Sequence, residues 1–327
     1  MSSDLANPIL VADIGGTNAR FALATADGRV GEATRYPGAD HPDFVALLRT
    51  FIASGDRCPV GAVLAIAAPI TGGTVKLTNS PWTISAPDIR DALSLARVVL
   101  INDFAAQALA LPALAPADLT PIGGGRSVDG AAMAVLGPGT GLGVAGLIPY
   151  GDGYFPVAGE GGHVTFAPTD AVQAAVVDRL VARFGHVSAE RILSGPGLVN
   201  VYGALAALEG GEAADISPAE VVARAKSGRD RHCVAAIALF CSALGSMAGD
   251  LALTFGARGG VYIGGGVSTH FGPLFDAAAV RRAFENKGRF QSYLSEIPLF
   301  RITMTDPALI GAARAYASPG TGSYVVD

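Results

Sequence analysis

The stretch "ILVADIGGTNARFALATADGRVGEATRY", residues 9–36, is the part of the chain that says most about its architecture. A glycine turn separates its first apolar run from a second, and Asp27-Gly28 forms a typical hairpin turn before a third. The stretch therefore predicts three successive strands. Because a strand and not a helix follows Gly15-Gly16-Thr17-Asn18, this turn is neither a Rossmann nor a Walker loop, both of which open a helix.

The opening pattern returns in "AMAVLGPGTGLGVAGLIPYGDG", residues 132–153, when Gly139-Thr140 is laid on Gly16-Thr17. The separation is too long for a solenoid unit and favours two lobes of similar design. The Pro- and Gly-rich segment 111–130 is the best boundary between them. We expect a small α/β lobe made of residues 1–112 and 303–327, and a large α/β lobe made of residues 113–302.

Helical patterns alternate with strand patterns along the rest of the chain. Apolar residues fall at helical spacing after residue 43, Ser85 opens a capping-box helix, and a buried strand ends at Asn102-Asp103. Further helices are expected at 171–184, 196–208, 218–225 and 232–253, followed by a strand at 259–268, a strand and helix over 298–317, and a loose tail. This order predicts an α/β sheet, in which ligands lie beyond the carboxyl ends of the strands.

Composition excludes several classes of function. The chain has 327 residues, 50% of them hydrophobic, and a net charge of -5 without a basic run, so neither nucleic acid nor a membrane is an expected partner. Three cysteines without a CxxC pair, and no secretion signal, favour the cytoplasm. The uncharged run 233–249 is short of the roughly 20 residues that a membrane span needs, so we expect a buried helix.

The two glycine loops could both bind phosphate. Backbone amides of residues 15–18 and of residues 137–141 can form anion-binding nests, and the alternative is that the glycines only make tight turns. Two matching loops favour phosphate. Asp13 beside the first loop could hold Mg²⁺ through water, or it could cap the turn. A literal GxGxxG at Gly141, Gly143 and Gly146 is not followed by a helix.

Polar residues among glycines are candidates for a polyol ligand. In "AGEGGHV", Glu160 can accept hydrogen bonds and His163 can donate or accept them, although a buried structural histidine is the ordinary alternative. Glu190 could equally be a first-turn carboxylate that interacts with a helix dipole. The run 264–266 would let a purine lie against the backbone, or it simply turns from a strand into a helix.

Seven motifs in order, "DIGGTN", "LTNSPW", "INDF", "LGPGTGLG", "GEGGHV", "ERILSGPGLVNVY" and "YIGGGV", resemble the bacterial ATP-dependent glucokinases of the hexokinase/actin/heat-shock ATPase superfamily. The resemblance extends from Leu10 to about Ala317. It implies a two-lobed actin-like ATPase (ribonuclease H-like) fold, with duplicated mixed β-sheet lobes and an interlobe cleft. The "CGxxGC" zinc motif of the related repressor/kinase family is absent, which places the chain in the zinc-free group.

The resemblance also implies transfer of the γ-phosphoryl group of Mg-ATP to the 6-hydroxyl of glucose, with Asp103 as the catalytic base. Implied sugar-binding residues are Asn79, Asn102, Asp103, Glu160, His163 and Glu190. Implied ATP-binding residues are Ala12, Asp13, Ile14, Gly15, Gly16, Thr17, Asn18, Gly137, Gly139, Thr140, Gly141, Gly264, Gly265 and Gly266. Asp13 is the implied Mg²⁺ residue, through water.

Other functions remain open at this point. The acceptor could be another hexose or an N-acetylated amino sugar, because one sequence does not reveal the shape of a pocket. An actin-like filament module would not need the Asn102-Asp103 and Glu160-x-x-His163 pairs, and a repressor would need a helix-turn-helix for which the first residues leave no room. The apolar helices suggest a homodimer.

Overall fold

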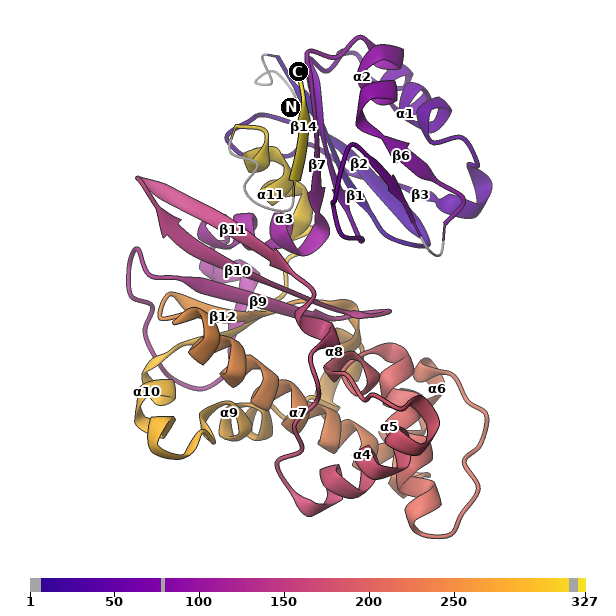
Figure 1. Cartoon of the computed structure of the whole chain (residues 1–327), viewed down its shortest axis with the longest axis vertical. Coiled ribbons are helices and arrows are strands. Elements are labelled where there is room, and N and C mark those ends of the chain that lie inside the picture. Colours follow the sequence, from indigo (N-terminus) through magenta and orange to yellow (C-terminus); the bar gives the residue numbers. More distant parts are fainter. Residues whose placement is uncertain (1–6, 78–79, 318–322) are drawn as a thin grey trace. The chain divides into compact units, whose positions relative to one another are not determined.

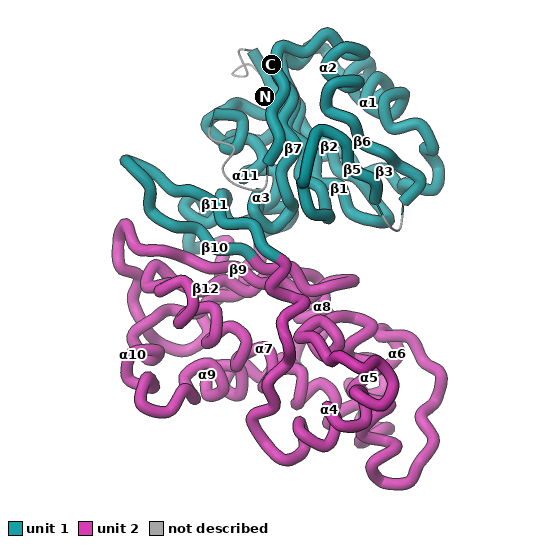
Figure 2. Tube along the Cα trace, viewed as in Figure 1, with its two compact units in different colours: residues 1–117, 145–159, 304–327 teal, residues 118–144, 160–303 magenta. Residues whose placement is uncertain are grey.

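The computed structural model describes residues 7–77, 80–317 and 323–327. The chain divides into two compact units (Figure 2). Unit 1 consists of residues 1–117, 145–159 and 304–327, and unit 2 of residues 118–144 and 160–303. The chain thus leaves unit 1, returns to it briefly, and ends in it.

Unit 1 contains a six-stranded mixed sheet in the order β14-β7-β4-β1-β2-β3 (Figure 1). The three central strands β1, β4 and β7 are parallel, and β2, β3 and β14 pair antiparallel with their neighbours. The strands are β1 (Ile9–Ile14), β2 (Asn18–Ala24), β3 (Thr34–Pro37), β4 (Gly61–Ile66), β7 (Arg97–Asn102) and β14 (Ser323–Val326), and a separate small sheet pairs β5 (Thr74–Lys76) with β6 (Thr83–Ser85). Buried β-branched and aliphatic residues fill the central strands, as a sheet covered on both faces requires.

The helices of unit 1 are α1 (Phe44–Ala53), α2 (Ala86–Leu93), α3 (Asp103–Ala110) and α11 (Pro307–Ala315). The expected capping residue is confirmed, because Ser85 Oγ accepts a hydrogen bond from the Asp88 amide at the start of α2. Helices α3 and α11 pack backbone to backbone. A Cβ on Gly311 of α11 would lie only 1.6 Å from the carbonyl oxygen of Ala106, so no other residue fits there without moving a helix.

The sheet of unit 2 repeats the design of the first, in the order β11-β10-β9-β12-β13-β8. Its parallel strands β9, β12 and β13 correspond to β1, β4 and β7, and the antiparallel edge strand β8 corresponds to β14. The strands are β8 (Leu119–Pro121), β9 (Met133–Pro138), β10 (Leu142–Tyr150), β11 (Gly153–Gly159), β12 (Gly260–Ile263) and β13 (Leu299–Ile302). The internal repeat read from the sequence is therefore a repeat of sheet topology, although residues 145–159, which contain most of β10 and all of β11, belong to unit 1.

Helices make up the remainder of unit 2: α4 (Ala171–Phe184), α5 (Gly195–Leu208), α6 (Pro218–Lys226), α7 (Arg231–Phe255), α8 (Gly266–Phe271), α9 (Ala277–Glu285) and α10 (Gln291–Glu296). Within the described ranges, α7 alone is long and apolar enough to cross a membrane, but most of its apolar stretch is buried inside the protein. It packs closely on α9, because a Cβ on Gly245 would lie 2.1 Å from the carbonyl oxygen of Val280. The expectation of a buried helix is confirmed.

Two predictions about local structure are wrong. The chain end is not a loose tail, because β14 pairs with β7 and adds Tyr324 and Val326 to the core of unit 1. The strand expected over residues 259–268 stops at Ile263, and α8 begins at Gly266. Gly265 has a φ of 78°, a conformation that ends a strand and that glycine adopts without strain.

Candidate active site

The first glycine loop lies in unit 1 between β1 and β2. The amide of Gly15 donates to the carbonyl oxygen of Asn18 at 3.0 Å, so this amide closes the turn. The second loop, between β9 and β10 in unit 2, is closed by a tighter hydrogen bond, from the Gly139 amide to the Gly141 carbonyl oxygen at 2.8 Å. The two turns thus occupy equivalent positions of the two sheets, although their closing hydrogen bonds differ, and neither closing amide is available to an anion.

Asp13 ends the apolar part of β1, and its carboxylate contacts a cation that the sequence analysis did not single out. Arg20 Nη1 donates to Asp13 Oδ2 at 3.0 Å, and Arg20 Nε lies 3.0 Å from Asp306 Oδ1. Burial raises the pKa of the Asp13 carboxyl, and Arg20 counteracts part of this rise. Asp306 precedes α11 and comes from the far end of the sequence, so no local spacing could have revealed this network.

Asn102 and Asp103 lie where β7 passes directly into α3. The Asn102 side-chain oxygen accepts from the amides of Phe104 and Ala105, at 3.0 and 3.1 Å, and so caps the helix. Its Nδ2 donates to the Ala68 carbonyl oxygen and to Asp103 Oδ1. Asn102 therefore has a structural task as the N-cap of α3.

Asp103 is the first residue of α3 and is half-buried. Its Oδ1 accepts hydrogen bonds from the Phe104 amide at 2.9 Å and from Asn102 Nδ2 at 3.2 Å. The first turn of a helix stabilises negative charge, so this position suits a carboxylate that is to act as a base. Asn79, which the sequence analysis placed near the sugar, lies outside the described residues.

In unit 2, the predicted adenosine segment lies against the second glycine loop. The Gly264 amide donates to the Leu136 carbonyl oxygen at 2.8 Å, and a Cβ on Gly265 would lie 2.4 Å from the carbonyl oxygen of Pro138. The structure therefore brings residues 264–266 and 137–141 together, although more than a hundred residues separate them in the sequence. This proximity is the arrangement that one nucleotide would require.

The predicted sugar residues of unit 2 lie on two loops beside the same hairpin. Glu160 and His163 are exposed, so the alternative of a buried structural histidine is wrong. His163 belongs to a single 3₁₀ turn, Gly161–His163, and a Cβ on Gly162 would lie 2.0 Å from the Leu142 carbonyl oxygen. Glu190 is half-buried in another 3₁₀ turn, Ala189–Arg191, and its Oε2 accepts from the Leu142 amide at 2.8 Å.

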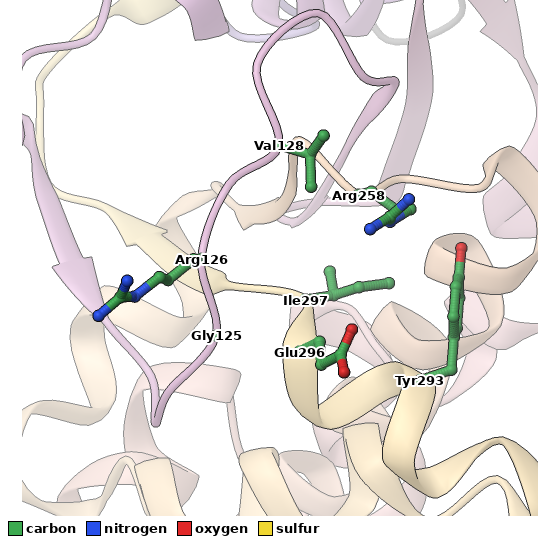
Figure 3. Close-up of a pocket in the computed structure, with 7 residues that line it drawn as sticks. All are labelled: Gly125, Arg126, Val128, Arg258, Tyr293, Glu296 and Ile297. Carbon is green, nitrogen blue, oxygen red and sulfur yellow. The ribbon is translucent and has the colours of Figure 1, made fainter.

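A surface pocket of about 420 Å³ in unit 2 contains none of the predicted site residues. It is lined by Gly125, Arg126, Val128, Arg258, Tyr293, Glu296 and Ile297. Figure 3 shows the guanidinium groups of Arg126 and Arg258 on opposite sides of the 125–128 segment, so they do not converge on one point. This pocket is therefore separate from the candidate residues of unit 2 that gather around the second glycine hairpin.

The chain is similar to known glucokinases over nearly its whole length. The glucokinase family model matches residues 10–319. A glucokinase from Chromobacterium violaceum is 47% identical over 94% of this chain and 88% of its own length, and one from Aromatoleum aromaticum is 46% identical over 94% of both chains. The crystal structure of a glucokinase from an Antarctic psychrotroph is 37% identical, covers 95% of this chain and 99% of its own, and superimposes with a TM-score of 0.87. With its paired hairpins, its duplicated sheets and these relatives, the chain belongs to the glucokinase family.

Proposed function

We propose that this chain transfers the γ-phosphoryl group of Mg-ATP to the 6-hydroxyl of glucose, giving glucose 6-phosphate and ADP. The observation that carries the proposal is the carboxylate of Asp103 at the carboxyl end of β7, in a family whose relatives are named glucokinase over the full length of the match. Phosphoryl transfer requires a positioned acceptor hydroxyl, a group that takes its proton, and stabilisation of the charge on the transferred group.

Asp103 is the proton acceptor in this mechanism. Its carboxylate is fixed by the Phe104 amide and by Asn102 Nδ2, so it cannot rotate freely when a hydroxyl approaches. General-base catalysis contributes roughly 10²- to 10⁴-fold, and correct placement of the reacting groups contributes further. Asn102 holds the junction of β7 and α3 in place. It would also bind the sugar if its Nδ2 donated to a sugar hydroxyl in place of its present acceptors.

Asp13 fits the proposed water-mediated Mg²⁺. Arg20 contacts Oδ2, and Oδ1 has no hydrogen bond within the described residues, so one oxygen next to the first glycine hairpin can accept from a metal-bound water. Mg²⁺ prefers such sites, where carboxylate, phosphate and water oxygens complete its coordination. When bound, the ion would neutralise charge on the phosphates, while Asp13 would accept a hydrogen bond from its water shell and Arg20 would keep the Asp13 carboxylate in place.

The nucleotide and the sugar have separate protein contacts in unit 2. We assign the triphosphate to the hairpin 139–141 and the adenosine to residues 264–266, which lie against it. Glu160 and His163 are exposed and can bind sugar hydroxyls, and Glu190 has a second carboxylate oxygen, Oε1, without a hydrogen bond in the described part of the chain. We assign these three residues to the sugar.

We also propose that the enzyme works in the cytoplasm as a homodimer. Three free cysteines, two of them buried in α7, support a reducing compartment. Size-exclusion chromatography with light scattering at micromolar concentration tests the proposed homodimer. A measured mass equal to that of a monomer would contradict it.

The test of the proposed reaction is a coupled assay of ADP formation with glucose, mannose, fructose and N-acetylglucosamine as acceptors. We expect glucose to give the highest kcat/KM, and the highest value with N-acetylglucosamine would instead identify an amino-sugar kinase. Asp103→Asn should retain glucose binding and lose about 10²-fold or more of kcat. Near-normal turnover by this variant would refute Asp103 as the base.

A further inference from the structure

Three loops that are far apart in the sequence are joined at the second glycine hairpin. Residues 164–166 pair with residues 187–189, through hydrogen bonds from the Ala189 amide to the Val164 carbonyl oxygen at 2.9 Å and from the Phe166 amide to the Val187 carbonyl oxygen at 3.0 Å. Gly162 packs directly on the backbone of Leu142, where β10 begins. The two loops that carry the sugar residues therefore form one body with the hairpin that we assign to phosphate.

Glu190 makes the direct connection. Its Oε2 accepts from the Leu142 amide at 2.8 Å, which is the first amide after the hairpin. A hydrogen bond to a charged acceptor is roughly twice as strong as one between neutral groups. The carboxylate thus uses one oxygen to hold the hairpin and has the other left for a ligand.

The hairpin is shaped to receive this carboxylate. A Cβ on Gly141 would lie 2.4 Å from Glu190 Oε2, whereas a Cβ on Gly139 would meet nothing nearer than 4.0 Å. Neither glycine has a positive φ within the described residues, so backbone strain does not explain either of them. The missing side chain at residue 141 makes room for Glu190.

A second connection joins the other side of the hairpin to the same loop. The Gly195 amide, at the start of α5, donates to the Gly139 carbonyl oxygen at 2.9 Å. Ser194 caps α5 through the Gly197 amide, and its hydroxyl donates to the carbonyl oxygen of Glu190 at 2.8 Å. The hairpin and the Glu190 loop are therefore fixed to each other at two points, so a shift of Glu190 would move the hairpin.

We propose that Glu190 is a positioning residue for the nucleotide as well as a sugar ligand, and that it couples the two sites energetically. The inference rests on the proposed function for the identity of the two ligands. A sugar hydroxyl on Oε1 fixes the carboxylate, which fixes the Leu142 amide and with it the phosphate hairpin. Coupling between binding sites is reciprocal, so a bound nucleotide favours sugar binding by the same factor.

The first test alters the second glycine hairpin and measures the affinity for glucose. Glucose binding to Gly141→Ala and Gly124→Ala is measured by calorimetry without nucleotide, with thermal unfolding to confirm that each variant is folded. The added methyl group at residue 141 must displace the carboxylate, so we expect glucose affinity to fall about tenfold, as the loss of one charge-assisted hydrogen bond predicts. Gly124 lies outside the proposed sites, and a Cβ there would meet nothing within 4 Å, so Gly124→Ala should bind glucose like the unmodified enzyme. Equal affinities in all three proteins would overturn the coupling.

The second test replaces Glu190 and measures the affinity for a nucleotide analogue. Binding of a non-hydrolysable Mg-ATP analogue to Glu190→Ala and Glu190→Gln is measured without sugar. Alanine removes the acceptor for the Leu142 amide, so we expect affinity to fall about tenfold, whereas the side-chain oxygen of glutamine can still accept and should restore most of it. Unchanged affinity in Glu190→Ala would remove the positioning role.

The two tests separate the inference from the proposed function. If the unmodified enzyme binds no glucose, the proposed substrate is wrong, but the analogue measurements still decide whether Glu190 positions the hairpin. If the unmodified enzyme binds glucose and both series of variants show its affinities, glucose remains the proposed substrate and the proposed coupling is refuted.

Discussion

Asp13 and Arg20 are direct cross-strand partners in β1 and β2, and Arg20 Nη1 donates to Asp13 Oδ2 at 3.0 Å. The same guanidinium contacts Asp306 Oδ1 at 3.0 Å, just before α11. One cation therefore holds two carboxylates that would otherwise repel each other. The arrangement orients Asp13 at the edge of the first glycine hairpin.

Replacing this cation should reduce turnover. In Arg20→Met the Asp13 carboxylate loses its hydrogen-bond donor and faces Asp306 without compensation, so we expect kcat to fall about tenfold or more. Arg20→Lys should recover part of the lost kcat, because lysine restores the positive charge but not the forked geometry of the guanidinium. Steady-state kinetics over a range of Mg²⁺ concentrations measures the effect. Arg29→Met, which removes an exposed ion pair with Asp27, is the matched control and should leave kcat unchanged.

The cap at Asn102 should be separable from its proposed contact with sugar. Asn102→Ala loses the acceptor for the first amides of α3, which costs about 1 kcal/mol of stability, and should also weaken glucose binding. Asn102→Ser keeps a capping oxygen and adds no charge beside Asp103, but it loses Nδ2, so its melting temperature should exceed that of Asn102→Ala while its KM for glucose rises. Equal glucose KM values in Asn102→Ser and the unmodified enzyme would show that Asn102 is a helix cap only.

Gly162 should be among the least tolerant positions of unit 2. A methyl group there would lie 2.0 Å from the Leu142 carbonyl oxygen, and forcing apart well-packed segments costs about 1–3 kcal/mol. We expect Gly162→Ala to lower the melting temperature and to raise the glucose KM, since it displaces the loop of His163. Gly159→Ala adds the same methyl group where nothing lies within 4 Å, and a melting temperature as low as that of Gly162→Ala would contradict the packing argument.

The two cysteines of α7 should be unreactive and should make the fold sensitive to alkali. Burial raises the pKa of Cys233 to about 12 and that of Cys241 to about 11, from an ordinary value of 9.0. When the pKa of a group is higher in the folded than in the unfolded protein, the group contributes stability that is fully present below the unfolded-state pKa. This stability is lost as the pH rises through the folded-state pKa. Stability should therefore decline between about pH 9 and pH 12.

Thiol titration and denaturant unfolding as a function of pH check this prediction. Native protein should react with a chromogenic disulfide at one site, the exposed Cys58, and unfolded protein at three. Replacement of both buried cysteines by alanine should flatten the alkaline decline. Rapid reaction of three thiols in the native protein would show that the α7 core is open.

The sequence predicted those elements whose pattern is complete within a short window. Phe44, Leu47, Leu48 and Phe51 line one face of α1 and are buried, as their spacing indicated. The short helices α8 to α10 were missed. Helices α8 and α10 have only six residues each, which is less than two turns and too short for a clear period. Strand β14 was missed as well, since its partner β7 lies more than two hundred residues earlier.

The same limit applies to the site. Asp13 and Asp103 could be chosen because they end apolar strands, which is a local signal. Arg20 and Leu142 could not, since what matters is a guanidinium shared with Asp306 and a backbone amide turned toward Glu190. Contacts made by backbone atoms, or by residues on distant segments, leave no trace in side-chain type or spacing.

The close packing of Gly311 on Ala106 has a consequence for the order of folding during synthesis. Helix α3, which carries Asp103, obtains its backing from a segment that leaves the ribosome only after the whole of unit 2. Unit 2 can thus fold while unit 1 still lacks residues 304–327. We infer that α3, and with it Asp103, becomes rigid only at the last stage of biosynthesis, because a chain stalled before residue 304 would lack the helix that packs against it.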